Sequence, residues 1–351
     1  MALSWRQTRP LPVPGRVFYR HPGAVPLRRV TPHDSPMIKD LFEQYPPYHH
    51  LVASTQLVLA MFGMGKVTRP GDFVELVREP KPMITGLLYQ LVGIPLLTAA
   101  LVYVIMLPPE VVVGFILIAA MPGGSLSNIY THLGKGNVAL SVALTGVMTL
   151  LALVTAPLIM RMFAGDFLPP EIAMPVGVIM REIFLFLLLP LIFGMILGRW
   201  LKETTAQRCS KWAVRASLLV LVVLVVGSLG SGSIDFTRYP VRIPLLVFCY
   251  CLIIQIIILR GSLHLLRFPI RDAMALGIES SMKNINLAVL IAASLFGIKG
   301  TNGEFGAGVL FVLLLYGGVS LGVAAVPMIS NLRHLRKAGK IRGAGNLDVS
   351  A

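Results

Sequence analysis

Hydrophobic residues gather along this chain into nine long runs, separated by short segments rich in Lys, Arg, Pro and Gly. A helix needs about 20 residues, each rising about 1.5 Å, to cross the hydrocarbon core of a bilayer. Most of the runs reach that length, so the pattern predicts an all-α polytopic membrane protein with about nine transmembrane helices. The predicted spans are 48–65, 83–107, 110–134, 137–162, 174–200, 212–233, 243–266, 270–296 and 304–329.

The composition agrees with this prediction. Of the 351 residues, 55% are hydrophobic and only 13% are charged, about half the charged fraction of a soluble domain. The net charge of +15 does not indicate nucleic-acid binding, because the Lys and Arg residues cluster between the apolar runs, where the positive-inside rule places them. The three Cys residues have neither metal-ligand nor disulfide spacing. The lipid bilayer is an expected partner, and binding to nucleic acid is not expected. The oligomeric state is left open.

Basic residues are concentrated in the odd-numbered loops between spans and after the last span. The positive-inside rule therefore predicts that these loops and the C-terminus are cytoplasmic and that the N-terminus lies outside. Residues 1–47 are expected to form a basic, disordered tail or a targeting segment, since the first thirty carry six Arg and no acid. The expected organisation is this tail, a transmembrane domain at 48–331 and a basic cytoplasmic tail at 332–351. The expected location is the bacterial inner (plasma) membrane, with a plastid or other organelle envelope as the alternative.

Two of the runs are interrupted near their middle. The first interruption is the segment 122–128, with the sequence PGGSLSN. Pro removes a backbone donor and Gly loosens the backbone, so the helix should open here. In lipid an opened backbone is tolerated only where protein or a wet cavity satisfies it. Two half-helix ends meeting here would form an ion or anion site; the alternative is a kinked helix packed through small residues.

The second interruption is the segment 279–284, with the sequence ESSMKN. A carboxylate and an ammonium at bilayer depth, here Glu279 and Lys283, are costly and by default mark a functional site. The alternative is an i, i+4 Glu–Lys pair on one helix face. Matching breaks in the two halves of a chain are the sequence pattern of an inverted-repeat transporter. The sequence therefore predicts inverted repeats whose two broken helices cross at the membrane centre, with the substrate between them.

The residues at both interruptions resemble the bile acid:sodium symporter family. The carrying motifs are PGG-x-x-SN at 122–128 and E-x-x-x-x-N at 279–284, supported by MFGMG at 61–65, GNVALS at 136–141 and Leu287-Ala288. The resemblance covers about 57–329. It implies a core domain that holds the crossed helices, a panel domain that rocks against it, and secondary active transport rather than an enzyme. The chain resembles bacterial-type members, which have ten helices. By this resemblance it is expected to lack the first of the ten.

The resemblance implies a first sodium site. Its residues would be Ser127, Asn128, Ser141, Thr145 and Glu279. The residue types suit the ion, because hard cations take oxygen ligands. Ser141 and Thr145 are four residues apart, so one helix face presents both hydroxyls. The break at Ser127 and Asn128 is expected to free carbonyls as well, and for each hydroxyl a bond back to the i−4 carbonyl is the alternative.

A second cation site is implied by the same resemblance. It would use Gln90, Glu279, the carbonyls of Ser280 and Met282, and the side chain at position 283. Many members have Gln at this last position, whereas this chain has Lys283. A protonated lysine has three donors and no lone pair, so it cannot ligate a cation. The hypothesis is that Lys283 replaces the second sodium, which leaves one sodium per cycle, or proton coupling if the lysine titrates; the alternative is a lysine that snorkels to water.

Substrates of the family are mostly organic anions, from small carboxylates such as pantoate and pyruvate to bile acids and sulfated steroids. The resemblance implies this class, with Ser125 and Asn284 as substrate-contacting residues. Half-helix N-termini near these two residues would present free amides to a carboxylate. No cofactor is expected, and sodium is the expected coupling ion.

Other classes of function remain as alternatives. A membrane-embedded serine hydrolase with Ser125 as nucleophile would need a base at membrane depth. The His residues fall near span ends or in loops, and the chain has no G-x-S-x-G sequence. A sodium-independent carrier, channel or receptor is a further alternative. The adjacent Arg181 and Glu182 in the fifth span are expected to form a salt bridge or interface pair rather than part of the transport path.

Overall fold

The computed structural model describes residues 48–67, 80–170, 172, 176–231, 239–296 and 303–337. Within these ranges the chain is helical almost throughout and contains no strand, only one isolated bridge between Gly123 and Lys283. The predicted tail 1–47 and residues 338–351 of the predicted C-terminal tail lie outside the described residues.

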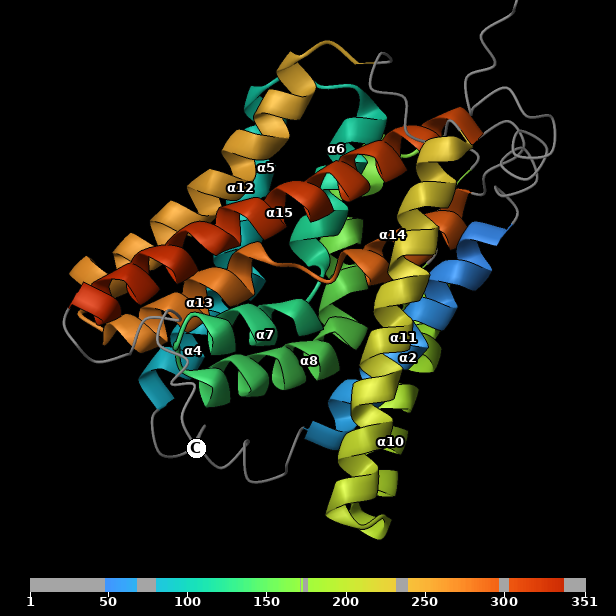
Figure 1. Ribbon diagram of the computed structural model, residues 1–351. Helices are drawn as coiled ribbons and strands as arrows, with labels where there is room; N and C mark the ends of the chain where they lie inside the picture. The colour runs from blue at the N-terminus through green and yellow to red at the C-terminus, as the bar shows by residue number, and fades with distance from the viewer. Residues whose placement is uncertain are drawn as a thin grey trace, which may run out of the picture. The chain divides into compact units, whose positions relative to one another are not determined.

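Helix occupies each of the nine predicted runs (Figure 1). The elements are α2 (His49–Val67), α4 (Pro80–Leu88), η4 (Tyr89–Gly93), α5 (Ile94–Val104), α6 (Pro109–Ala120), α7 (Ser125–Leu133), α8 (Val138–Ala164), η5 (Gly165–Phe167), α9 (Val176–Glu182), η6 (Ile183–Leu188), α10 (Leu189–Trp200), α11 (Glu203–Gly230), α12 (Arg242–Arg260), η7 (Gly261–Leu265), α13 (Ile270–Ser281), α14 (Ile285–Phe296) and α15 (Gly303–Lys337). Six continuous helical stretches in the described ranges are long and apolar enough to span a membrane. The prediction of an all-α polytopic membrane protein is confirmed, while the count of nine crossings stays a prediction.

Both interrupted runs are broken helices. Helix α6 ends at Ala120 and α7 begins at Ser125, and α13 ends at Ser281 before α14 begins at Ile285. Met121 and Gly124 have extended backbone angles, so a merely kinked helix, the alternative from the sequence, is wrong. The breaks are narrower than expected, because Ser127 and Asn128 already lie in the first turn of α7, and Glu279 lies in the last turn of α13.

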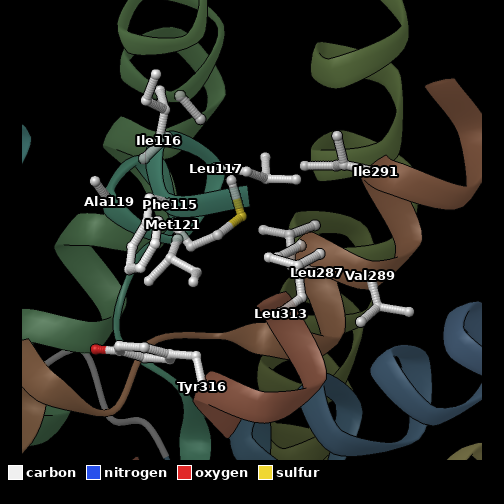
Figure 2. Packing of buried hydrophobic residues seen from close by; sticks show 14 of the residues in the cluster. Phe115, Ile116, Leu117, Ala119, Met121, Leu287, Val289, Ile291, Leu313 and Tyr316 are labelled. Atoms are coloured by element: carbon white, nitrogen blue, oxygen red, sulfur yellow. The ribbon is translucent and has the colours of Figure 1, made fainter. Parts of the chain in front are cut away.

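The short apolar helices α6 and α14 form the interior. Every residue of α6 from Val111 to Ala120 is buried, as expected for a helix that is hydrophobic all round. Figure 2 shows Phe115 and Leu117 of this helix in one cluster with Leu287 of α14 and Tyr316 of α15. The broken helices are thus enclosed by protein, which is the condition for opened backbone at membrane depth.

Helix α2 packs against α10 and α11 through glycines (Figure 1). A side chain at Gly65 would overlap the backbone of α10 at Leu191, and one at Gly63 would approach the Val214 side chain of α11 to 2.8 Å. Small residues let helix backbones approach closely in membranes. This close packing is the structural role of the glycines in the MFGMG sequence. On the opposite side α11 exposes large apolar residues such as Leu219 and Val222, as a lipid-facing helix does.

Candidate functional site

The two breaks meet and satisfy each other's backbone. The Gly124 amide donates to the Met282 carbonyl at 2.9 Å, and the Asn284 amide donates to the Pro122 carbonyl at 2.8 Å. These two bonds form the antiparallel bridge between Gly123 and Lys283. Groups that the broken helices leave without intrahelical partners are therefore paired across the crossing, as burial of backbone requires.

Glu279 lies against the first break. The residue is fully buried, and its carboxylate is so close to Gly123 that a methyl group at this position would overlap it. Gly123 is therefore required by a close approach, because only a residue without a Cβ leaves room for the carboxylate.

Hydroxyl and amide oxygens surround the Glu279 carboxylate. The Ser127 hydroxyl hydrogen bonds to Oε2, and Ser141 Oγ lies 3.0 Å from the same oxygen. Thr145 Oγ1 donates to Oε1 at 2.5 Å. Asn128 Oδ1 lies 2.7 Å from Ser141 Oγ and 3.4 Å from Thr145 Oγ1. The structure thus brings together all five residues of the expected first sodium site, from α7, α8 and α13.

The chemistry of this cluster fits a monovalent hard cation. Six side-chain oxygens converge around a single negative charge, and hard cations prefer oxygen ligands. Nowhere in the described ranges do three or more His, Cys, Asp or Glu residues gather as they would around a transition metal. Thr145 Oγ1 also lies 2.9 Å from the Ser141 carbonyl, so the back-bond that the sequence left open is present beside the contact with Glu279.

Lys283 lies in the second break and reaches Gln90. Its ammonium donates to Gln90 Oε1 at 3.1 Å, and both side chains are buried, with 5% and 1% of their surface exposed. Because Lys283 follows the end of α13, the expected alternative of a Glu279–Lys283 pair on one helix face is wrong. The snorkelling alternative is also wrong, since the side chain is buried. Gln90 lies in η4, a π-helical turn, a feature frequent at functional sites.

Met282 and Ser280 are the remaining residues of the expected second cation site. Met282 already uses its carbonyl to accept the Gly124 amide. The buried Ser280 hydroxyl has no hydrogen-bond partner in the described part of the chain. With Lys283 bonded to Gln90, a protonated Lys283 would place an ammonium where other side chains would offer lone pairs.

The expected substrate residues line a cavity of about 570 Å³ beside the breaks. Ser125 begins α7, and Asn284 precedes α14. Asn284 also caps α14, because its Oδ1 accepts the Leu287 amide at 3.2 Å. Lys283 lies on the same wall. Two residues that the sequence did not single out, Asn286 and Gln56, line this cavity or an adjoining one; nothing in their local sequence marks them.

The expected salt bridge in the fifth span is present. An Arg181 guanidinium nitrogen lies 3.0 Å from Glu182 Oε1. His50 of α2 approaches the second oxygen of this carboxylate at 3.4 Å, a contact that the sequence did not predict. The carboxylate is fully buried, and its contact with His50 joins α9 to α2.

A helical membrane protein in which two broken helices cross at a buried carboxylate, beside a cavity, is a membrane transporter by fold and site. Residues 55–232 match the family model described as Sodium Bile acid symporter family. The chain is 35% identical over 243 residues to the uncharacterized sodium-dependent transporter YocS of Bacillus subtilis (strain 168), a match that covers 68% of this chain and 73% of that protein. The chain therefore belongs to the sodium bile acid symporter family.

Other relatives are more distant. The probable sodium/metabolite cotransporter BASS1, chloroplastic, of Arabidopsis thaliana is 27% identical over 69% of this chain and 59% of its own length. The mouse sodium/bile acid cotransporter 4 is 28% identical over 60% of this chain and 49% of its own length. The chain thus spans about half to three fifths of the length of these two relatives.

Family membership decides between a transporter and an enzyme. The chain is a multi-pass membrane protein of a family of sodium-dependent transporters and is not an enzyme. The similarity to the Bacillus protein favours the bacterial plasma membrane over a plastid envelope.

Proposed function

We propose that the protein carries an organic anion together with sodium, by alternating access. The observation that supports this most is the position of the oxygen cluster around Glu279 directly beside a cavity that both half-helix N-termini line. Positive helix ends favour an anion, and the carboxylate cluster favours a cation. The cation and the anion would thus bind on neighbouring faces of the same crossing.

Alternating access would use the helices on the two sides of this cavity. Leu57, Ala60 and Met61 of α2 line one wall, and Ser125 and Asn284 line the wall at the crossing. The two breaks are hydrogen bonded to each other, so the crossing would move as one unit. In the proposed cycle α2, α10 and α11 form the panel, which rocks against the core that contains the crossing, so that the cavity opens alternately to each side of the membrane.

We further propose that one sodium ion is coupled to each substrate. Sodium would bind to Ser127, Asn128, Ser141, Thr145 and Glu279. The second cation position would be filled by the Lys283 ammonium, which is buried against Gln90. A tethered charge supplies the electrostatic balance of a second cation but is not transported. A lysine that exchanged its proton during the cycle would instead give proton coupling, which is the second candidate.

Uptake into proteoliposomes tests the proposal. The purified protein should accumulate labelled carboxylates, tested as a panel from pyruvate to steroid acids, above their equilibrium level when sodium is higher outside. Replacing sodium by potassium should abolish the accumulation. Uptake that only equilibrates, or that ignores sodium, would contradict coupled symport, and accumulation driven by a pH gradient without sodium would favour proton coupling.

A further inference from the structure

Two cavities adjoin each other at the crossing. The larger measures about 570 Å³ and the smaller about 150 Å³. Five residues line both cavities and so form the boundary between them: Ala60, Ser125, Leu126, Leu221 and Asn286. The two cavities together have a volume in the range of sites that bind small organic molecules. One ligand could therefore extend from one cavity into the other.

The linings of the two cavities differ in charge. The larger cavity is mostly apolar and includes Lys283. The smaller cavity has no charged residue among the described residues that line it, but it is rich in neutral polar groups. These are Gln56, Ser125, Asn128, Ser210, Ser217 and Asn286. These neutral groups can replace the hydration of an uncharged polar group of a ligand by forming hydrogen bonds to it.

Gln56 is the unusual residue of the smaller cavity. It lies on α2, is 3% exposed, and its buried Oε1 has no hydrogen-bond partner among the residues that the structure describes. Leaving a buried acceptor unpaired destabilises a folded protein. The nearby Ser210 and Ser217 hydroxyls already donate to the Gly63 and Val214 carbonyls, at 2.6 and 2.8 Å. Helix packing therefore satisfies the serines but leaves the glutamine amide for a ligand.

From this arrangement we infer that the smaller cavity is a subsite for an uncharged hydrogen-bonding group of the substrate, and that Gln56 selects this group. The inference rests on the proposed transport of an organic anion and makes the substrate class narrower. The transported anion would carry a hydrogen-bond donor, such as a hydroxyl or an amide N–H, in addition to its acidic group. The apolar body would occupy the larger cavity, where Lys283 and the half-helix N-termini favour the acidic group.

Matched pairs of ligands test the subsite. The probes are straight-chain monocarboxylates from hexanoate to dodecanoate, each paired with its ω-hydroxy derivative, and the methyl esters of both. Dissociation constants are measured by calorimetry on the purified full chain in sodium. We expect the wild type to bind at least one hydroxylated acid about fivefold to tenfold more tightly than its plain partner, as one added hydrogen bond allows.

Variants at two positions of α2 test whether Gln56 causes the preference for hydroxylated acids. Gln56→Met keeps the side-chain length and should bind both members of each pair equally, with the affinity for the plain acid unchanged. Gln56→Asn keeps an amide that is one methylene shorter and should retain only part of the preference. Ser54→Ala is the matched control, because Ser54 is also buried on α2 but lines neither cavity, and it should keep the full preference.

The outcomes separate this inference from the proposed function. Equal binding of plain and hydroxylated acids at every chain length, or a preference that persists in both Gln56 variants, would overturn the subsite. If the esters bind as tightly as the acids while the hydroxyl preference still depends on Gln56, the subsite stands and anion transport is wrong. If no probe binds, both are wrong.

Discussion

At the scale of single residues, Glu279 and Lys283 illustrate how burial gives polar groups a function. Both lie at membrane depth, where an unpaired charge is costly. Each has partners from distant parts of the chain: Glu279 contacts hydroxyls of α7 and α8, and Lys283 contacts Gln90 of η4. The two side chains therefore bond to different partners, which lie on different helices.

Replacing Glu279 by Gln should weaken sodium binding about tenfold to a hundredfold, because one charge-assisted ligand contributes about 1.5–3 kcal/mol. Sodium-dependent uptake in proteoliposomes measures the effect as a raised sodium concentration for half-maximal rate. Glu110→Gln is the control, since Glu110 accepts a hydrogen bond from Tyr239 at the start of α6 and an amide oxygen can still accept it. Unchanged sodium dependence in Glu279→Gln would contradict the site.

Replacing Lys283 by Gln should change the sodium stoichiometry. The variant removes the ammonium and supplies lone pairs beside Gln90, so a second sodium can bind. The Hill coefficient for sodium in uptake should be near one in the wild type and rise toward two in Lys283→Gln. The exposed Lys202 provides the control Lys202→Gln, with the wild-type coefficient expected. A wild-type Hill coefficient near two would rule out the replacement of sodium by lysine.

At the scale of elements, the crossing of the two broken helices depends on glycine. Pro122 and Gly124 take part in backbone bonds to the second break, and Gly123 lies against the carboxylate of α13. A continuous helix would satisfy its own backbone but would leave no room for Glu279. The break thus makes room for the proposed cation site, and the hydrogen bonds between the two breaks replace the lost helical bonds.

Gly123→Ala should displace the Glu279 carboxylate, because its methyl group would overlap that side chain. Overpacking of this kind costs about 1–3 kcal/mol, so we expect a lower melting temperature and sodium affinity weakened at least fivefold. Gly177→Ala in α9 has open space around the added methyl and serves as the control. Both quantities can be read from thermal unfolding in increasing sodium. Gly123→Ala with wild-type sodium affinity would contradict the close approach.

At the scale of the whole molecule, sodium binding should stabilise the folded protein. An ion that binds only the folded state adds about 1.4 kcal/mol per tenfold rise in concentration and per site once the site is nearly saturated. The site draws its ligands from three helices, α7, α8 and α13, so it exists only when these helices are packed together.

The melting temperature of the wild type should therefore rise linearly with the logarithm of sodium concentration and should not respond to potassium. The slope in Lys283→Gln should be about twice the wild-type slope, because two sites would then be linked to folding. Fluorescence-monitored unfolding in detergent at fixed ionic strength measures these melting temperatures. Equal responses to sodium and potassium would show that the stabilisation is a general salt effect and not site binding.

The sequence by itself determined where the helices run and where two of them break. Run length set the spans, because the bilayer requires about 20 apolar residues, and Pro122 with its two following glycines set the first break through local backbone preferences. The four oxygen-bearing residues around Glu279 were also predictable, through motifs that resemble a known family. Only the tertiary structure decided that the breaks satisfy each other, that Lys283 reaches Gln90 across 193 residues, and that Gln56 remains buried with an unpaired amide oxygen. These contacts join helices distant in the chain, so they depend on packing and not on any local pattern of residues.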